Sequence, residues 1–311
     1  MTVKKILIDT DPGQDDAIAI LLALASPELE VVGITTVAGN VPLPLTSRNA
    51  RIICELAGRT DMPIFAGAAK PLQRELVTAE FVHGKSGLDG IELPEPQMRL
   101  REGHAVDFLV ETLMRLEGIT VCALGPLTNI ALALQKEPRI AARIEQIVLM
   151  GGGCFEGGNI TPAAEFNFFV DPQAAALVFA AGIPITMAPL DVTHQALTTR
   201  PRIAALRALG NRTGLACAAW MEFFERFDEE KYGQEGGPLH DPCVIAWLLK
   251  PELFTGRRCN VEIETSSDLT LGMSVVDWWG VTPRKQNALV LGGIDAEGYF
   301  KLITERLGAL P

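Results

Sequence analysis

Short runs of β-branched and aliphatic residues alternate with longer helical patterns from residue 4 to about residue 190. Strands that alternate with helices favour βαβ units, in which parallel strands pair within one sheet. We therefore predict an α/β fold with an open, mainly parallel twisted sheet and a Rossmann-like core. Strands are expected at Lys4–Asp9, Val31–Val37, Pro63–Ala66, Thr120–Leu124, Gln146–Met150 and Pro184–Ala188.

Helical patterns fill the segments between these strands. The first of them is apolar almost all round, so it is expected to be buried. Helices are predicted at Asp16–Ala25, Pro44–Ala57, Ala105–Leu116, Asn129–Gln135 and Pro172–Ala180.

The pattern changes after Asp191. Helices are expected to dominate from about residue 202 to residue 227 and again over Pro242–Leu249. A late strand pair, Asn260–Glu264 and Met273–Val276, is expected to add an edge to the sheet. Because we find no linker, repeat or low-complexity segment, we predict one domain over residues 1–311 with a helical elaboration.

Charge and cysteine content narrow the class of partner. With 27 basic and 38 acidic residues the net charge is −11, so the chain should repel nucleic acid and anionic membrane surfaces. A small neutral substrate suits this charge better. The six cysteines include no CxxC pair and are expected to be reduced and mostly buried. Because no secretory signal or apolar run of about 20 residues is visible, we expect a cytoplasmic protein.

The densest polar feature is the segment Asp9-Thr10-Asp11-Pro12-Gly13-Gln14-Asp15-Asp16, hereafter the aspartate segment. Its four carboxylates directly follow the first predicted strand, and its Pro-Gly pair favours a turn that folds them toward one point. Crowded carboxylates repel one another unless a hard cation such as Ca²⁺ or Mg²⁺ lies among them. Helix capping and a solvated acidic turn are the alternative, but they account for only one or two of the acids.

Further polar groups follow the later strands, at the sheet edge where ligands bind in open α/β folds. Each also has a plain structural explanation as a turn, a loop or a helix cap. Amides and a carboxylate in an otherwise apolar setting suit sugar hydroxyls, which both donate and accept hydrogen bonds. The residues are Asn40, His83 in the glycine-rich loop 83–90, the Leu124 carbonyl, Asn159, Glu165, Asn167, His240 and Asp241.

Taken together, these motifs resemble the inosine–uridine-preferring nucleoside hydrolases. The aspartate segment followed by Ala17 is the signature of that family, and segments 83–90, 125–129, 165–167 and 240–241 occur in its order and approximate spacing. The resemblance implies the nucleoside hydrolase fold and hydrolysis of the N-glycosidic bond of ribonucleosides to ribose and free base. The likeness to bacterial pyrimidine-preferring members implies a preference for uridine and cytidine.

The resemblance also implies a Ca²⁺ cofactor and a role for each matched residue. Asp11, Asp16, Asp241 and the Leu124 carbonyl would hold calcium; the family often has Thr at the Leu124 position, but only the main chain binds. Asp11 would act as general base toward a calcium-bound water, which Asn40 would help to place.

Substrate contacts are implied in the same way. Asp15 and Asn167 would bind the ribose 2′- and 3′-hydroxyls. Asn159 and Glu165 would bind the 5′-hydroxyl. The base pocket would be bordered by His83, His240, Phe166 and the Phe227–Tyr232 region, with Tyr232 as an aromatic contact and His240 as a candidate proton donor to the leaving base.

Members of this family commonly form homodimers or homotetramers, so one of these is expected here. Two other functions stay open at this point. Asp9-Thr10-Asp11 superficially resembles the nucleophile motif of metal-dependent phosphohydrolases, although no suitable later Lys is found. A non-catalytic nucleoside-binding protein would use the same pocket, but it would not need the groups that position a water.

Overall fold

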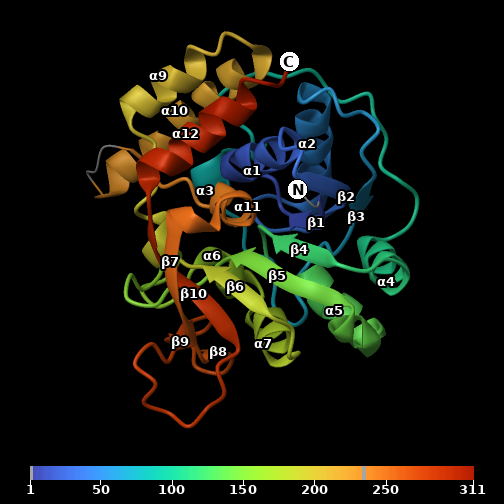
Figure 1. The fold of residues 1–311 in the computed structure, drawn as a ribbon, viewed down its shortest axis with the longest axis vertical. Helices are drawn as coiled ribbons and strands as arrows, with labels where there is room; N and C mark the ends of the chain where they lie inside the picture. Colours follow the sequence, from blue (N-terminus) through green and yellow to red (C-terminus); the bar gives the residue numbers. More distant parts are fainter. Residues whose placement is uncertain (1–2, 233–235) are drawn as a thin grey trace.

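The computed structural model describes residues 3–232 and 236–311, and within residues 227–232 it describes the backbone only. Its centre is an eight-stranded sheet with the order β3-β2-β1-β4-β5-β6-β10-β7 (Figure 1). The strands are β1 (Lys4–Thr10), β2 (Leu29–Thr36), β3 (Ile64–Ala66), β4 (Ile119–Ala123), β5 (Ile144–Met150), β6 (Ile185–Ala188), β7 (Phe254–Cys259) and β10 (Ala288–Ile294).

Neighbouring strands of this sheet pair in parallel, except that β7 runs antiparallel to β10. The predicted open, mainly parallel α/β sheet is therefore confirmed, and all six predicted strands belong to it. The strand order reverses between β1 and β4, because the chain first builds outward on one side of β1 and then on the other. A crevice outside the carboxyl ends of the strands at such a reversal is where open α/β sheets bind ligands.

Helices cover both faces of the sheet (Figure 1). Side chains alternate between the two faces along each strand, so Ile6 and Ile8 of β1 join one hydrophobic core while Leu7 joins the other. The first core packs under α1 (Gln14–Leu24), α2 (Leu43–Leu56), α9 (Arg200–Arg207), α10 (Arg212–Tyr232), α11 (Pro242–Leu249) and α12 (Ala296–Leu307). The second packs under α4 (Ala105–Arg115), α5 (Thr128–Lys136) and α7 (Pro172–Ala180).

Short elements complete the chain. They are α3 (Glu80–His83), α6 (Phe166–Val170), α8 (Leu190–Thr193) and the 3₁₀ helices η1 (Pro138–Ala142) and η2 (Pro251–Leu253). The predicted helices are present, and α1 is buried along nearly its whole length, as its all-round apolar sequence indicates.

The prediction that the late strand pair extends the main sheet is wrong. Those residues form β8 (Val261–Ile263) and β9 (Ser274–Val276), which pair only with each other. The edge is formed by β7, in which the middle residues Thr255–Arg258 are exposed, so its sequence lacks the apolar run that marks a buried strand. The side chain of Asn287 bonds the backbone amide and carbonyl of Val261, at 2.8 and 2.9 Å, and attaches β8 beside the sheet without continuing its ladder.

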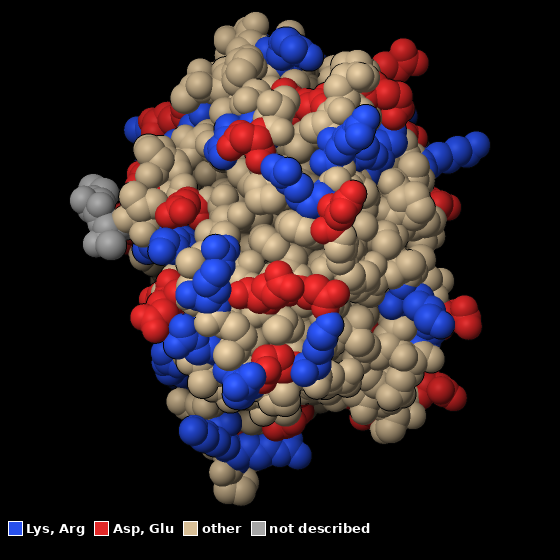
Figure 2. All heavy atoms as spheres, turned by 90° about the vertical axis from the view of Figure 1, so that its right-hand side faces the viewer, with Lys and Arg blue, Asp and Glu red and all other residues tan. Residues whose placement is uncertain are grey.

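Charges of both signs are interspersed on the molecular face seen in Figure 2, with no large field of Lys and Arg. Such a mixed surface does not offer the basic stripe that a phosphate backbone requires. Within the described ranges, none of the helices combines the length and the apolar character needed to traverse a lipid bilayer.

Candidate active site

A cavity opens at the carboxyl ends of the strands, beside the reversal of strand order. Ten of the predicted site residues line it, and they come from loops and helices spread along the whole chain. These ten are Asp15, Asn40, His83, Leu124, Asn159, Glu165, Phe166, Asn167, His240 and Asp241. Asp11 and Asp16 are fully buried and do not line the cavity.

Three buried carboxylates, two of which line the cavity, form a group that could hold a metal ion, hereafter the metal group. Asp15 and Asp16 lie in the first turn of α1, and Asp241 lies at the start of α11, which packs against α1. One ligand oxygen from each lies within 4.8 Å of the others, and all three residues are buried. Although Asp241 occupies the N-cap position of α11, its side chain caps no amide of that helix. The predicted ligands Asp16 and Asp241 are thus brought together, with Asp15 beside them.

Asp11 lies directly beneath this group, between two glycines. A Cβ atom at Gly39 would approach Asp11 Oδ2 to 2.0 Å, and one at Gly125 would approach Oδ1 to 2.1 Å. The chain can therefore pass this closely only because neither residue has a side chain. The backbone N–H of Asn40 donates to Asp11 Oδ2 at 2.7 Å, and the Asn40 side-chain amide donates to Asp16 Oδ2 at 3.2 Å.

The electrostatics of these acids suit a hard cation. Burial, followed by the negative charges of Asp16 and Asp15, raises the pKa of Asp11 well above its ordinary value. Burial and the charge of Asp16 raise the pKa of Asp15 to about 8. Among the described residues, Asp11 Oδ1 and Asp15 Oδ1 are buried without a hydrogen-bond partner. An all-oxygen donor set with unpartnered carboxylate atoms fits a divalent ion such as Ca²⁺ or Mg²⁺.

Asp16 is positioned by contacts within its own segment. Its Oδ1 accepts a short hydrogen bond from the Thr10 hydroxyl, and its Oδ2 accepts the Gly13 amide at 2.9 Å. The second contact is one half of a capping box, so the same acid helps to start α1 and belongs to the metal group. The role of Thr10 was not predicted, although a hydroxyl between two aspartates is a fitting partner for either.

Asp9 does not join the other three acids of the aspartate segment, contrary to the expectation that all four converge. Its Oδ1 accepts hydrogen bonds from the Thr35 hydroxyl at 2.5 Å and from the Asn129 amide at 2.8 Å. Burial is the main cause that raises the pKa of Asp9 to about 7. Asn129 also donates to the Thr36 carbonyl at 3.0 Å and accepts the Ala68 amide at 2.8 Å, so Asp9 belongs to a network that ties neighbouring strand ends together.

Amide and carboxylate groups form one wall of the cavity. Glu165 caps α6 by accepting the Asn167 amide at 2.8 Å, and burial raises the pKa of Glu165 to about 7. The side-chain amide of Asn167 donates to the carbonyl of Leu124 at 2.9 Å, and both residues line the cavity. Asn159 Oδ1 accepts the Phe166 amide at 2.9 Å.

Three histidines and three phenylalanines also line the cavity: His83, His194, His240, Phe81, Phe166 and Phe224. His83 is buried, and burial lowers the pKa of its imidazole to about 3. Burial, followed by the proximity of His194 and His83, lowers the pKa of His240 well below its usual range. His240 Nδ1 lies 2.7 Å from the Thr193 hydroxyl, and Phe224 packs near both His83 and His240.

Some lining residues were not predicted. His194 lies at the end of α8, 3.1 Å from Glu156, and Phe224 lies on α10. Phe81 of α3 also lines the cavity and is 56% exposed. Each lies on, or at the end of, a helix whose position relative to the sheet cannot be predicted from the neighbouring sequence. Tyr232 was predicted as an aromatic contact, but its side chain lies outside the described residues.

Comparison with known proteins agrees with this geometry. Residues 6–301 match the family model described as inosine-uridine preferring nucleoside hydrolase. An uncharacterized protein of Schizosaccharomyces pombe is 55% identical over 99% of this chain and 100% of its own length. The pyrimidine-specific ribonucleoside hydrolase RihA of Salmonella agona is 50% identical over 97% of both chains.

Solved structures show the same fold. The purine-preferring ribonucleoside hydrolase from Gardnerella vaginalis superposes with a TM-score of 0.91 at 32% identity, covering 98% of both chains. The match over nearly the whole chain includes the aspartate segment and the C-terminal acid of the metal group. The chain therefore belongs to the inosine–uridine-preferring nucleoside hydrolase family and is a ribonucleoside hydrolase, an N-glycosidase.

Proposed function

We propose that this enzyme hydrolyses pyrimidine ribonucleosides, uridine and cytidine, to ribose and free base with Ca²⁺ as its cofactor. The observation that carries the proposal is the buried group Asp15, Asp16 and Asp241 beside a cavity with an amide-rich wall. The pyrimidine preference is supported by the 50% identity to a hydrolase named for that specificity.

Asp16, Asp241, Asp11 and the Leu124 carbonyl would hold the ion. A bound Ca²⁺ would act as a Lewis acid that lowers the pKa of the attacking water. Asp11 takes the proton of this water as general base. Its Oδ1 has no hydrogen-bond partner, so this oxygen is available to accept a proton. Asn40 fixes the direction of the Asp11 carboxylate through its backbone amide, and its own side chain helps to place the water.

Ribose binding is assigned to the polar wall. The 2′- and 3′-hydroxyls bind to Asp15, whose carboxylate accepts hydrogen bonds, and to Asn167, whose amide can donate or accept them. Asn159 and Glu165 bind the 5′-hydroxyl. Holding the sugar over the acids places the anomeric carbon next to the water, so the reaction gains from proximity. The reaction passes through an oxocarbenium-like transition state, whose positive charge the nearby carboxylates stabilise.

The nucleobase leaves more easily once it is protonated or hydrogen-bonded. His240 is proposed as the donor. Burial and the nearby histidines lower its pKa, so its protonated form gives up a proton more readily than an ordinary imidazolium. Phe166 and Phe224 supply apolar surface for the base, and His83 borders it.

The proposal is tested by measuring ribose release from uridine, cytidine, inosine and adenosine with and without complete calcium removal. We expect the two pyrimidine nucleosides to be preferred, and activity to vanish with the ion and return when calcium is restored. Equal rates on all four substrates would defeat the pyrimidine preference, and full activity after calcium removal would defeat the metal assignment.

Asp11 is tested separately, and so are the two rival functions. Folded Asp11→Ala should release ribose from uridine at least about a hundredfold more slowly than the parent. Phosphate release from a generic phosphoester, or tight nucleoside binding without turnover, would favour the phosphohydrolase or the binding protein instead.

A further inference from the structure

Gln14 is buried in the aspartate segment immediately before Asp15, yet its side chain makes its hydrogen bonds with His83 and Asp89 of another loop. Its amide nitrogen donates to two backbone carbonyls, of His83 at 3.0 Å and of Asp89 at 3.1 Å. Its amide oxygen lies 2.6 Å from His83 Nδ1. Gln14 thus connects the start of α1 to both ends of the loop that follows α3.

The two carbonyls fix which way the Gln14 amide points. If the amide were turned over, its oxygen would face two other oxygens and its nitrogen would lose both acceptors. The oxygen must therefore face the imidazole of His83. Because a carbonyl oxygen can only accept, the hydrogen between the two side chains belongs to His83 Nδ1.

Packing holds the ring in this orientation. A Cβ atom at Gly13 would approach His83 Nδ1 to 2.5 Å and Cε1 to 2.8 Å, so the Nδ1–Cε1 edge lies against the Gly13 backbone. A neutral imidazole with its proton on Nδ1 has its acceptor lone pair on Nε2. His83 lines the cavity, and Gln14 and Gly13 occupy its Nδ1–Cε1 edge, so Nε2 is the ring nitrogen left for a ligand.

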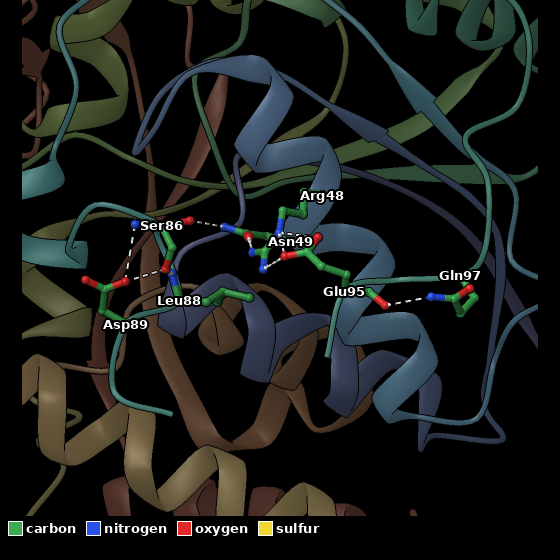
Figure 3. A network of polar contacts seen from close by, with 7 residues as sticks. All are labelled: Arg48, Asn49, Ser86, Leu88, Asp89, Glu95 and Gln97. Carbon is green, nitrogen blue, oxygen red and sulfur yellow. Dashed lines mark hydrogen bonds and ion pairs between the residues drawn. The ribbon is translucent and has the colours of Figure 1, made fainter. Parts of the chain in front are cut away.

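The loop itself is held independently of Gln14. Asn49 of α2 donates to the carbonyl of Pro12 at 2.9 Å and to that of Ser86 at 2.8 Å. Figure 3 shows Asn49 reaching Ser86, whose amide and hydroxyl in turn face the Asp89 carboxylate. The loop therefore has two attachments to the aspartate segment, of which only Gln14 touches the His83 ring.

We propose that Gln14 is a positioning residue that fixes the tautomer of His83, so that His83 Nε2 accepts a hydrogen bond from an N–H of the nucleobase. This deepens the proposed nucleoside hydrolase function and rests on it. Uracil offers N3–H and cytosine offers its exocyclic amine. His83 donates its Nδ1–H to Gln14 and therefore recognises the base only as a hydrogen-bond acceptor. The proton for the leaving base must then come from another residue.

The tautomer is read by ¹⁵N NMR of the calcium-loaded full-length chain labelled at histidine. The chain has only 4 histidines, and a His83→Gln variant identifies the resonances of His83. We expect a protonated Nδ1 and an unprotonated Nε2 in the parent. An unprotonated Nδ1 and a protonated Nε2 in the parent would overturn the proposal, whatever the Gln14 variants show.

Two near-isosteric variants separate the acceptor from the loop attachment. Gln14→Met removes the oxygen that faces His83, and we expect it to move the proton toward Nε2. Asn49→Leu removes only the other attachment and should leave the tautomer unchanged. Gln14→Glu keeps an acceptor oxygen and should also keep the proton on Nδ1. An unchanged tautomer in folded Gln14→Met would refute the assignment.

The kinetic arm compares uridine with N3-methyluridine, which lacks the base N–H. We expect Gln14→Met to reduce the preference in kcat/KM for uridine about fivefold, as for one neutral hydrogen bond, and Asn49→Leu to preserve it. An undiminished preference in Gln14→Met would refute base reading by His83. If the chain cleaved no nucleoside at all, the proposed function would fail while the NMR result would still decide the role of Gln14.

Discussion

Gly125 follows β4, and its missing side chain leaves the space that the Asp11 carboxylate occupies. An alanine Cβ there would lie 2.1 Å from Asp11 Oδ1 and 2.8 Å from its Cγ, whereas real Cβ contacts stay above 3.0 Å. The carboxylate would have to retreat by roughly 1 Å, and Gly39 blocks its other side. A displacement of about 1 Å in a catalytic group costs on the order of a hundredfold in rate.

Gly125→Ala should therefore lower kcat for uridine about a hundredfold. Overpacking of this kind also costs about 1–3 kcal/mol of folding stability, which a protein of this size tolerates. Ribose release under saturating uridine and calcium gives kcat, and circular dichroism verifies that the variant is folded.

Gly308→Ala is the matched control. Gly308 caps the last helix with an ordinary negative φ, and a Cβ there would meet only Leu209 Cδ2, at 3.3 Å, and backbone oxygens at 3.5 Å. Its kcat should equal that of the parent. If folded Gly125→Ala kept its rate within about threefold of the parent, the close packing of Asp11 would not govern catalysis.

Four further results are expected. Asp241→Asn should weaken calcium binding at least about tenfold by calorimetry; unchanged affinity would remove Asp241 from the ligand set. Burial and a neighbouring charge raise the pKa of Asp15 from 3.8 to about 8, so between these pH values the metal-free folded chain binds more protons than the unfolded chain. Its melting temperature should therefore fall as the pH rises from 4 to 8, and a rise in melting temperature would contradict this. Asn129→Leu should cost about 2–3 kcal/mol in urea unfolding by depriving Asp9 of a partner, and a neutral effect would show that the network is dispensable. His240→Gln should slow uridine cleavage about a hundredfold yet spare p-nitrophenyl riboside, whose leaving group needs no proton; equal losses on both would reject the acid role.

The sheet and the acids of the aspartate segment were largely predictable because their causes are local, whereas the role of Asp241 was expected only from the family resemblance. β-branched runs predict buried strands, and the aspartate segment concentrates acids at one strand end. Asp16 and Asp241 then meet because α1 and α11 pack together on one face. That Asp15 joins them while Asp9 turns to Thr35 and Asn129 could not be predicted, since both outcomes depend on side-chain packing across strands.

Other features depend on contacts between distant segments. The edge strand β7 was not predicted because its middle residues are exposed and give no apolar run. No local pattern places Phe224 or His194 at the cavity. In the sequence, Gln14 follows a predicted turn and precedes a predicted helix, and nothing in that pattern indicates a functional role. Its importance appears only when the loop after α3 is seen against it. The extent of the domain, the cytoplasmic location and the homodimeric or homotetrameric state stay predictions.

The acids that could hold the ion come from opposite ends of the chain, Asp15 and Asp16 near its beginning and Asp241 in its last quarter. A chain emerging from the ribosome therefore carries two of these three acids early, and the third only after most of its length has been made. The complete group exists only when α11 has docked against α1, so a bound ion would stabilise that docking. Calcium should accordingly slow unfolding more than it speeds refolding.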